Sequence, residues 1–86
     1  MAFALAPDVV VADCEGGVVL LDQRNGRHWR LNRTGAATLR LLLDGYSLEA
    51  AAARLVRDFP DAAQSAQADV RNLIGTLQQA QLVEAS

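Results

Sequence analysis

The sequence predicts an α+β fold in which a three-stranded antiparallel meander is followed by three helices. Between residues 7 and 31, short runs rich in valine and leucine alternate with the turns Glu15-Gly16-Gly17 and Asn25-Gly26. After residue 33, apolar residues recur at the i, i+3, i+4 spacing of amphipathic helices. A length of 86 residues suits one domain. We expect residues 7–86 to form it and residues 1–6 to be a loose N-terminal arm.

The three strands are predicted at residues 7–12, 18–22 and 27–31. Pro7 suits the first position of a strand, and Val9-Val10-Val11 have high strand propensity. Short turns connect the strands in the order 1-2-3, so the third strand is expected to be an edge.

Two registers are possible for the second hairpin. A two-residue turn sets Asp22 opposite Trp29, whereas a three-residue loop sets Leu21 opposite Trp29 and Val19 opposite Leu31. We predict the three-residue loop, because it gathers the apolar side chains on one face and a slip by one residue would expose them.

The alternation of an antiparallel ladder then orients the backbone of the edge strand. Arg27, Trp29 and Leu31 are expected to point their N–H groups toward the second strand. His28 and Arg30 are expected to point theirs to the open edge.

The first helix is predicted at residues 34–43, with Asn32 or Thr34 as its N-cap and Asp44-Gly45 at its end. Ser47 is the expected cap of the second helix, which Pro60 ends. This helix has a predicted buried stripe of Leu48, Ala51, Ala52, Leu55, Val56 and Phe59.

The third helix is predicted at residues 66–80, with Ser65 as a candidate cap and Leu82-Val83 docking the tail. Its buried stripe is Ala66, Val70, Leu73, Ile74, Leu77 and Ala80. Gly75 either permits close approach of another backbone or is a tolerated defect.

The charges are unevenly spread, although the formal net charge is only −2. Residues 23–43 hold five arginines and no acidic residue, whereas the segments on both sides are acidic. This basic island suits an acidic peptide better than a long polyanion. Residues 2–12 lack a basic start and contain Asp8, so we predict no signal peptide, no membrane span and a cytoplasmic location.

No catalytic set is recognisable, and we predict neither a metal site nor a cofactor. His28 is the only histidine and Cys14 the only cysteine. Asp22 is expected opposite His28 in the predicted hairpin, and we interpret the two as a solvated cross-strand pair.

Trp29 and the third helix allow two interpretations each. Trp29 is either core alone or core and groove wall, since its parity matches Leu31. Asp69, Asn72 and Thr76 form a polar line at i, i+3, i+7, which is either a solvated face or a groove wall opposite the edge strand.

A hairpin with three helices is similar to a winged helix-turn-helix with its strands placed first. The candidate recognition helix carries Arg71 as its only base, whereas a DNA reader needs several for phosphates. We therefore predict no nucleic-acid binding.

Several motifs together resemble the PqqD-like family, also called RiPP recognition elements, over about residues 8–84. They are Leu20-Leu21-Asp22, Gly26, Leu31-Asn32-Arg33-Thr34-Gly35-Ala36, Leu42-Leu43-Asp44-Gly45 with Ser47, and Ala68-Asp69-Val70 followed by Leu73, Leu77 and Leu82-Val83. The family usually has glycine where Gln81 stands and often tyrosine at Phe59.

The resemblance implies a non-catalytic domain that binds the leader segment of a ribosomally made precursor peptide. The leader would add as a strand to the edge strand, in a groove closed by the third helix. The residues implied in peptide binding are Arg27, His28, Trp29, Arg30, Leu31, Asp69, Val70, Asn72, Leu73, Thr76 and Leu77.

Within the family, the chain looks most like the stand-alone leader-binding B1 proteins of lasso-peptide pathways. The implied partner is a separate transglutaminase-like leader peptidase, which acts before an asparagine-synthetase-like cyclase. The alternative is a chaperone for the pyrroloquinoline quinone precursor, with a radical SAM enzyme as partner. We expect a monomer.

Overall fold

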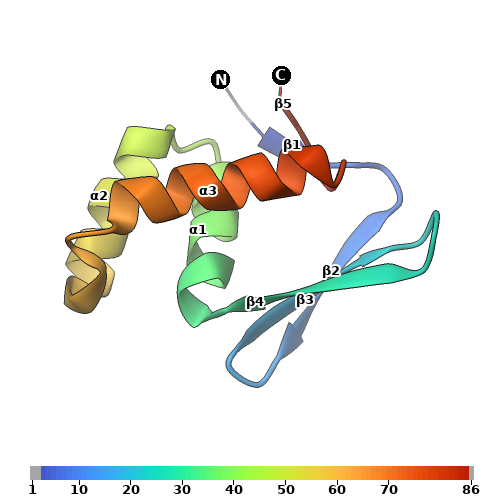
Figure 1. The fold of residues 1–86 in the computed structure, drawn as a ribbon, viewed down its shortest axis with the longest axis horizontal. Helices are drawn as coiled ribbons and strands as arrows, with labels where there is room; N and C mark the ends of the chain where they lie inside the picture. Colours follow the sequence, from blue (N-terminus) through green and yellow to red (C-terminus); the bar gives the residue numbers. More distant parts are fainter. Residues whose placement is uncertain (1–2, 86) are drawn as a thin grey trace.

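The computed structural model describes residues 3–85 as a small α+β domain with helices on one side of a sheet (Figure 1). The order of the elements is β1 (Phe3–Leu5), β2 (Val9–Cys14), β3 (Gly17–Asp22), β4 (Arg27–Asn32), α1 (Arg33–Leu43), α2 (Leu48–Asp58), the 3₁₀ turn η1 (Pro60–Ala62), α3 (Ala66–Gln79) and β5 (Val83–Ala85). The predicted meander and three helices are confirmed. No helix among the described residues is long and apolar enough to cross a membrane.

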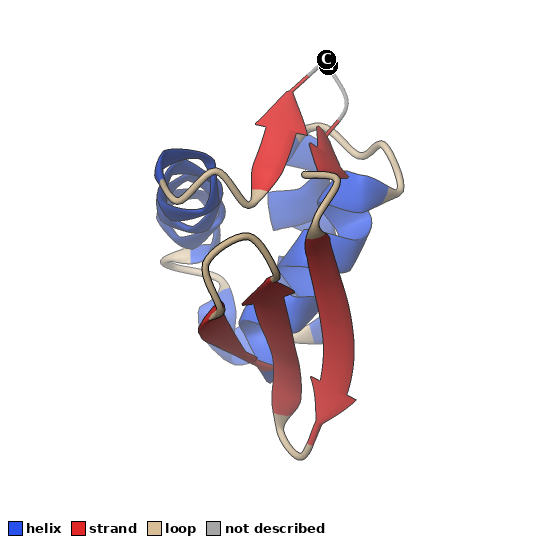
Figure 2. Ribbon diagram, turned by 90° about the vertical axis from the view of Figure 1, so that its right-hand side faces the viewer, coloured by secondary structure: helices blue, strands red, loops and turns tan. Residues whose placement is uncertain are grey.

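The central sheet is antiparallel with the order β2-β3-β4, and it is clearly visible in Figure 2. β4 is therefore an edge strand, as predicted. Gly17 begins β3 opposite Asn32, and a Cβ at Gly17 would lie 1.8 Å from the Leu31 carbonyl oxygen. Glycine at this position allows the end of β4 to pair closely with β3.

The register of the β3–β4 hairpin differs from both that we considered. Leu20 pairs with Trp29 and Val18 with Leu31, so the loop contains four residues, 23–26. Val18 and Leu20 are 1% and 0% exposed, and they form the core face. Leu21, which we expected on that face, is 37% exposed on the other.

The chemistry of the turn explains this register. The Asp22 carbonyl accepts the N–H of Gly26 at 2.9 Å, and Gly26 has a φ of +73°, which glycine adopts without strain. The Asp22 carboxylate also accepts the backbone N–H of Arg24 at 3.0 Å. Asp22 thus pairs with Arg27 in the ladder, and the expected pairing of Asp22 with His28 is wrong.

The expectation of a loose arm over residues 1–6 is wrong where the structure describes it. Phe3–Leu5 form β1, which pairs antiparallel with β5 in a second, two-stranded sheet. Phe3 and Ala6 are 6% and 3% exposed, and Ala6 donates its N–H to the Leu82 carbonyl at 2.9 Å. Burial of Phe3 and these backbone hydrogen bonds hold the segment in place. Residues 1–2 lie outside the described part.

The ends of the first two helices follow the predicted caps. The Asn32 side chain accepts the N–H of Gly35 at 2.8 Å, which decides between the two candidate caps of α1. Gly45 follows α1 with a φ of +99°. Ser47 accepts the N–H of Ala50 at 3.0 Å and caps α2.

The start of α3 departs from prediction. Ser65 makes no capping hydrogen bond, and its hydroxyl donates to the Asp69 carboxylate at 2.9 Å. Gly75 has open space around the position of a Cβ, so it is a tolerated defect and not a point of close approach.

The end of α3 is a Schellman motif without glycine. Gln81 has a φ of +60°, its N–H donates to the Gln78 carbonyl, and the Leu82 N–H donates to the Leu77 carbonyl at 2.9 Å. Leu82 and Val83 dock as predicted, at 0% and 4% exposure.

The core lies between the sheet and the helices, and it also takes in β1 and β5. Most of the predicted stripe residues belong to it, but Val56 is 37% exposed and is not part of it. Its largest fully buried side chains are Leu20, Leu39, Leu42, Leu55, Leu77, Leu82, Val18 and Val70.

Candidate functional site

A groove separates the edge strand β4 from α3, which run in opposite directions (Figure 1). One end is a hollow of about 420 Å³ lined by Asp22, Asn25, Arg27, Trp29, Thr76, Gln79, Ala80 and Gln81. The other end is lined by Asn32, Thr34, Gly35, Thr38, Asp69, Asn72 and Leu73.

The backbone of β4 presents hydrogen-bonding groups to this groove. Gln23 donates its N–H to Asp8 on the β2 side at 2.9 Å. The backbone N–H and C=O groups of successive residues point to alternate sides of a strand. The groups that point toward β4 are therefore those of Asp22, Leu20 and Val18. The residues of β4 that pair with these three point their N–H groups back toward β3. The N–H groups of His28 and Arg30, which alternate with them, point to the open edge. The N–H groups of β4 therefore have the orientation expected from the sequence, although the β3–β4 register differs from the expected one.

The side chains of β4 divide between the two faces of the sheet. Arg27, Trp29 and Leu31 pair with the core-facing residues of β3 and share their face. His28 and Arg30 lie on the opposite face. These two residues can therefore meet a strand at the edge through their backbone, but their side chains project away from α3.

The position of Trp29 matches the second interpretation, in which it is both core and groove wall. It is half-buried and packs against the core, and it also lines the hollow at the Arg27 end of the groove. Leu31 packs against the core in the same way.

The predicted residues of α3 separate into two sets. Asp69, Asn72, Leu73 and Thr76 line the groove, so the polar line is a groove wall. Val70 and Leu77 are 0% and 1% exposed in the core. In this structure they do not line the groove where we expected peptide contact, and they hold α3 on the core.

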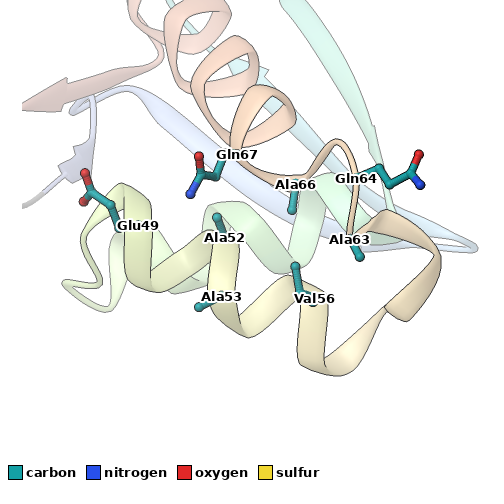
Figure 3. Close-up of a pocket in the computed structure, with 8 residues that line it drawn as sticks. All are labelled: Glu49, Ala52, Ala53, Val56, Ala63, Gln64, Ala66 and Gln67. Carbon is teal, nitrogen blue, oxygen red and sulfur yellow. The ribbon is translucent and has the colours of Figure 1, made fainter.

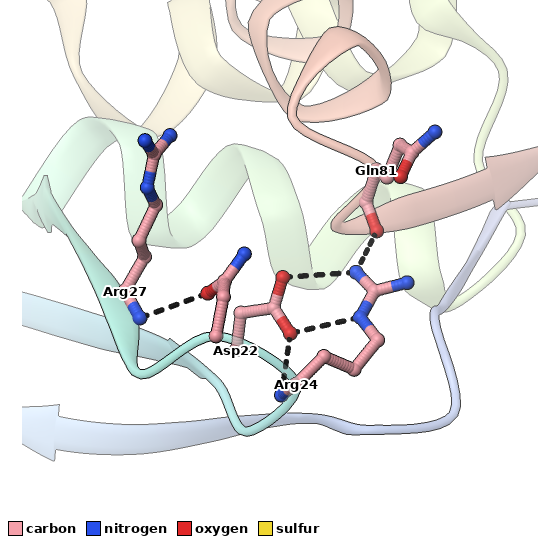
Figure 4. A network of polar contacts seen from close by, with 5 residues as sticks. Asp22, Arg24, Arg27 and Gln81 are labelled. Atoms are coloured by element: carbon pink, nitrogen blue, oxygen red, sulfur yellow. Dashed lines mark hydrogen bonds and ion pairs between the residues drawn. The ribbon is translucent and has the colours of Figure 1, made fainter.

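An ion pair between the buried Asp22 and the partly exposed Arg24 lies at the Arg27 end of the groove, and sequence reasoning did not identify it (Figure 4). Asp22 is 2% exposed, and its two carboxylate oxygens accept Nε and Nη2 of Arg24, each at 2.9 Å. Nη2 also donates to the Gln81 carbonyl at 2.8 Å. The available signal was the carboxylate that directly follows an apolar strand, two positions before an arginine.

The same contacts shift both ionisation equilibria. The hydrogen bonds from the Arg24 guanidinium hold the pKa of Asp22 below its ordinary value, against the opposing effect of burial. The Asp22 carboxylate raises the pKa of Arg24, and the charges of Asp8 and Glu84 act in the same direction. The pair is therefore fully charged at neutral pH.

The far end of the groove is acidic. Asp58, Asp61 and Asp69 line a hollow there with Phe59 and Pro60. Arg27 lines the near end. The groove thus has a basic end at the start of β4 and an acidic end near the start of α3.

A separate hollow lies between α2 and the start of α3 (Figure 3). Its wall is mainly alanine and Val56, with Glu49, Gln64 and Gln67 at the rim. None of the predicted site residues lies in it, and Glu49 is its only titratable side chain.

The described residues hold no candidate metal site. Residues 3–85 contain no group of three or more histidine, cysteine, aspartate or glutamate side chains placed to hold a metal ion. Binding through backbone groups and side-chain pockets is what this groove can do chemically.

Comparisons with known proteins agree with this geometry. The family model of coenzyme PQQ synthesis protein D (PqqD) matches residues 17–83. The structure is similar to that of a lasso peptide synthetase B1 complexed with the leader peptide, with 33% identity, coverage of 99% of this chain and 100% of that chain, and a TM-score of 0.88.

A second solved structure, TbiB1 in complex with the TbiA(beta) leader peptide, is 23% identical. The match covers 100% of this chain and 98% of that chain, with a TM-score of 0.81. At 23% identity this likeness concerns the fold alone. A search of curated proteins found no match.

Proposed function

The chain belongs to the PqqD family, and on this premise we propose that it binds the leader segment of a ribosomally synthesised precursor peptide. The observation that carries the proposal is the likeness, over 99% of the chain, to a B1 protein solved with a leader peptide. The proposed role is recognition and delivery in the cytoplasm, where the precursor is made, with no catalysis by this chain.

The proposed mode of binding is strand addition to β4. The N–H groups of His28 and Arg30 face an open edge, and a strand placed there would lie about 4.8 Å from β4. The wall of α3 supplies Asn72, Leu73 and Thr76 for side-chain specificity. Backbone hydrogen bonds would provide affinity, and the hollows at the two ends of the groove would select leader residues.

We further propose that the partner enzyme is a separate transglutaminase-like leader peptidase of a lasso-peptide pathway. A chaperone for the pyrroloquinoline quinone precursor, acting with a radical SAM enzyme, is the second candidate, and the matching family model favours it by its description. The precursor and enzymes encoded beside the gene distinguish the two.

Calorimetry tests the binding proposal. The probes are the leader peptide bound by the 33% identical B1 protein and a synthetic copy of the leader encoded beside the gene. We expect saturable binding of at least one probe at a 1:1 ratio. Failure of both to bind would refute the proposed function.

A cleavage assay tests the absence of catalysis. We expect the precursor to remain intact with this chain alone and to be cut when the neighbouring peptidase is added. Cleavage by the isolated chain would contradict the proposal.

A DNA-binding role is the weakest alternative. Arg71 is the only basic residue of α3, too few for phosphate contacts along a duplex. We expect no sequence-dependent retardation of duplex DNA at physiological salt.

A further inference from the structure

We propose that Arg24 is a positioning residue for leader binding, because it fastens the β3–β4 hairpin to the end of α3 and so sets the width of the groove. The inference rests on the proposed function. Arg24 itself is placed to fix the two walls between which a leader strand has to fit.

Arg24 is held rigidly from one side. Both oxygens of the buried Asp22 carboxylate accept its guanidinium, and one also accepts its backbone N–H at 3.0 Å. A guanidinium paired through two parallel hydrogen bonds has a fixed plane. The second N–H of Nη2 is therefore held in a set direction, toward the Gln81 carbonyl (Figure 4).

Gln81 completes the connection from the other side. Its left-handed backbone, with φ +60°, ends α3, and its carbonyl accepts Arg24 Nη2 at 2.8 Å. Among residues 3–85, this is the only side-chain hydrogen bond between the β3–β4 hairpin and the segment from α3 onward. The two positions are 57 residues apart in the chain.

The location of this link gives it a role in the groove. Asp22 and Gln81 both line the hollow that also contains Trp29. β4 packs on β3 and α1, whereas α3 packs on α2, α1 and β5, so the two walls belong to different layers. Without Arg24 the hairpin loop would be free to move away from α3, and ordering it again would cost affinity.

Trp29 provides a direct readout, because it is the only tryptophan and lies in the hollow. The test compares Arg24→Met, which removes the guanidinium but keeps an unbranched side chain, with wild type. Arg40→Met is the matched control, since Arg40 pairs with the exposed Asp13 of β2 and neither residue lines the hollow that contains Trp29. Each protein is examined by acrylamide quenching of Trp29, by thermal melting and by affinity for whichever leader probe binds the wild type.

We expect Arg24→Met to fold, to show stronger quenching of Trp29 and to bind the probe about tenfold more weakly. Arg40→Met should match wild type in quenching and affinity. A lower melting temperature with unchanged quenching and unchanged affinity would overturn the proposal, because Arg24 would then serve stability alone.

Arg24→Lys keeps the test decisive if the methionine variant fails to fold. Lysine retains the charge beside Asp22 but cannot hold two carboxylate oxygens and the Gln81 carbonyl in one plane. Stronger quenching in this variant supports the proposal, and values equal to wild type contradict it. If no probe binds the wild type, the proposed function fails, while the quenching still decides whether Arg24 sets the groove.

Discussion

Asp22 is an acidic side chain buried at the end of an apolar strand, and its charge is sustained by one arginine. Replacing Arg24 alone leaves the buried carboxylate of Asp22 unpaired, whereas replacing Asp22 alone frees a guanidinium that is partly exposed to solvent. The stability that the pair contributes therefore depends on the protonation of Asp22, since Arg24 remains charged at all ordinary pH values.

This dependence predicts a stability loss in acid with a defined sign. The pKa of Asp22 in the folded protein lies below its ordinary value of 3.8, so the unfolded state binds the proton first as pH falls. The contribution is complete above about pH 5 and is lost as pH falls through 3.8 toward the folded pKa. We expect the difference in melting temperature between wild type and Asp22→Asn to shrink between pH 6 and pH 3. If the difference in melting temperature does not vary with pH, Asp22 stabilises the fold through packing and not through its charge.

Gln81 is strained where the family usually has glycine. A left-handed backbone costs a non-glycine residue roughly 1 kcal/mol, and Gln81→Gly should stabilise the fold by about 0.5–1 kcal/mol in chemical denaturation. The carbonyl that Arg24 binds is retained, so leader affinity should not change. Gln78→Gly is the control, because it lies within α3 and should destabilise by up to about 1 kcal/mol. If both substitutions change the free energy of unfolding by the same amount, the backbone of Gln81 is not strained.

At the scale of the elements, β4 is the strand on which the proposed function depends. Proline removes an N–H and is tolerated on an edge only where that N–H faced outward. His28→Pro and Arg30→Pro should fold with about 1 kcal/mol lost, yet bind leader at least about tenfold more weakly. Trp29→Pro should damage the fold, because its N–H bonds β3 and its side chain packs on the core.

Melting temperature and leader affinity of the three variants decide between the possible outcomes. Folded variants at positions 28 and 30 that bind normally would show that the leader does not pair with β4. If the proline variants at positions 28 and 30 unfold and the variant at position 29 folds, the N–H groups of β4 have the opposite orientation to the one assigned here.

The boundaries of the first two helices could be predicted from the sequence because caps and turns are local. Asn32, Gly45 and Ser47 each act within three residues of their own position. The register of the hairpin could not be predicted in this way. Residues 18–21 are all apolar, so the sequence pattern does not decide which of them face the core. The deciding contact was the turn anchored by Asp22, which becomes visible only in three dimensions.

The candidate site was predictable in part for a related reason. The edge strand and the polar line of α3 follow from periodicity, and Trp29, Asn72 and Thr76, which we expected in the site, line the groove. Val70 and Leu77 were assigned to it although their own stripe marked them as core. The link from Arg24 to Gln81 joins two distant segments, and no local pattern encodes it.

In the molecule as a whole, β1 and β5 close the fold behind the groove. Neither three-residue strand has a periodic pattern, and each depends on the other for backbone partners. Because β5 follows directly from the Gln81 turn, the N-terminal segment helps to hold the end of α3 to which the hairpin is fastened. Segments from both ends of the chain thus support one wall of the groove.

The charge distribution of the whole molecule leads to the last prediction, which compares two arginines of the basic island. Arg27 lies on the groove face of β4 and lines the hollow, whereas the side chain of Arg30 lies on the opposite face. An acidic leader residue at the near end of the groove would meet Arg27, and the pair would be screened by salt over a Debye length of about 8 Å.

We therefore expect leader affinity to fall with added salt, and Arg27→Glu to slow association more than it speeds dissociation in stopped-flow measurements. Arg30→Glu is the matched control, with the same change of net charge on the same strand, and its effect on association should be smaller. Equal slowing by both reversals would mean that only net charge steers the peptide. Salt-independent binding by the wild type would remove both arginines from recognition, because attraction between exposed charges weakens as ionic strength rises.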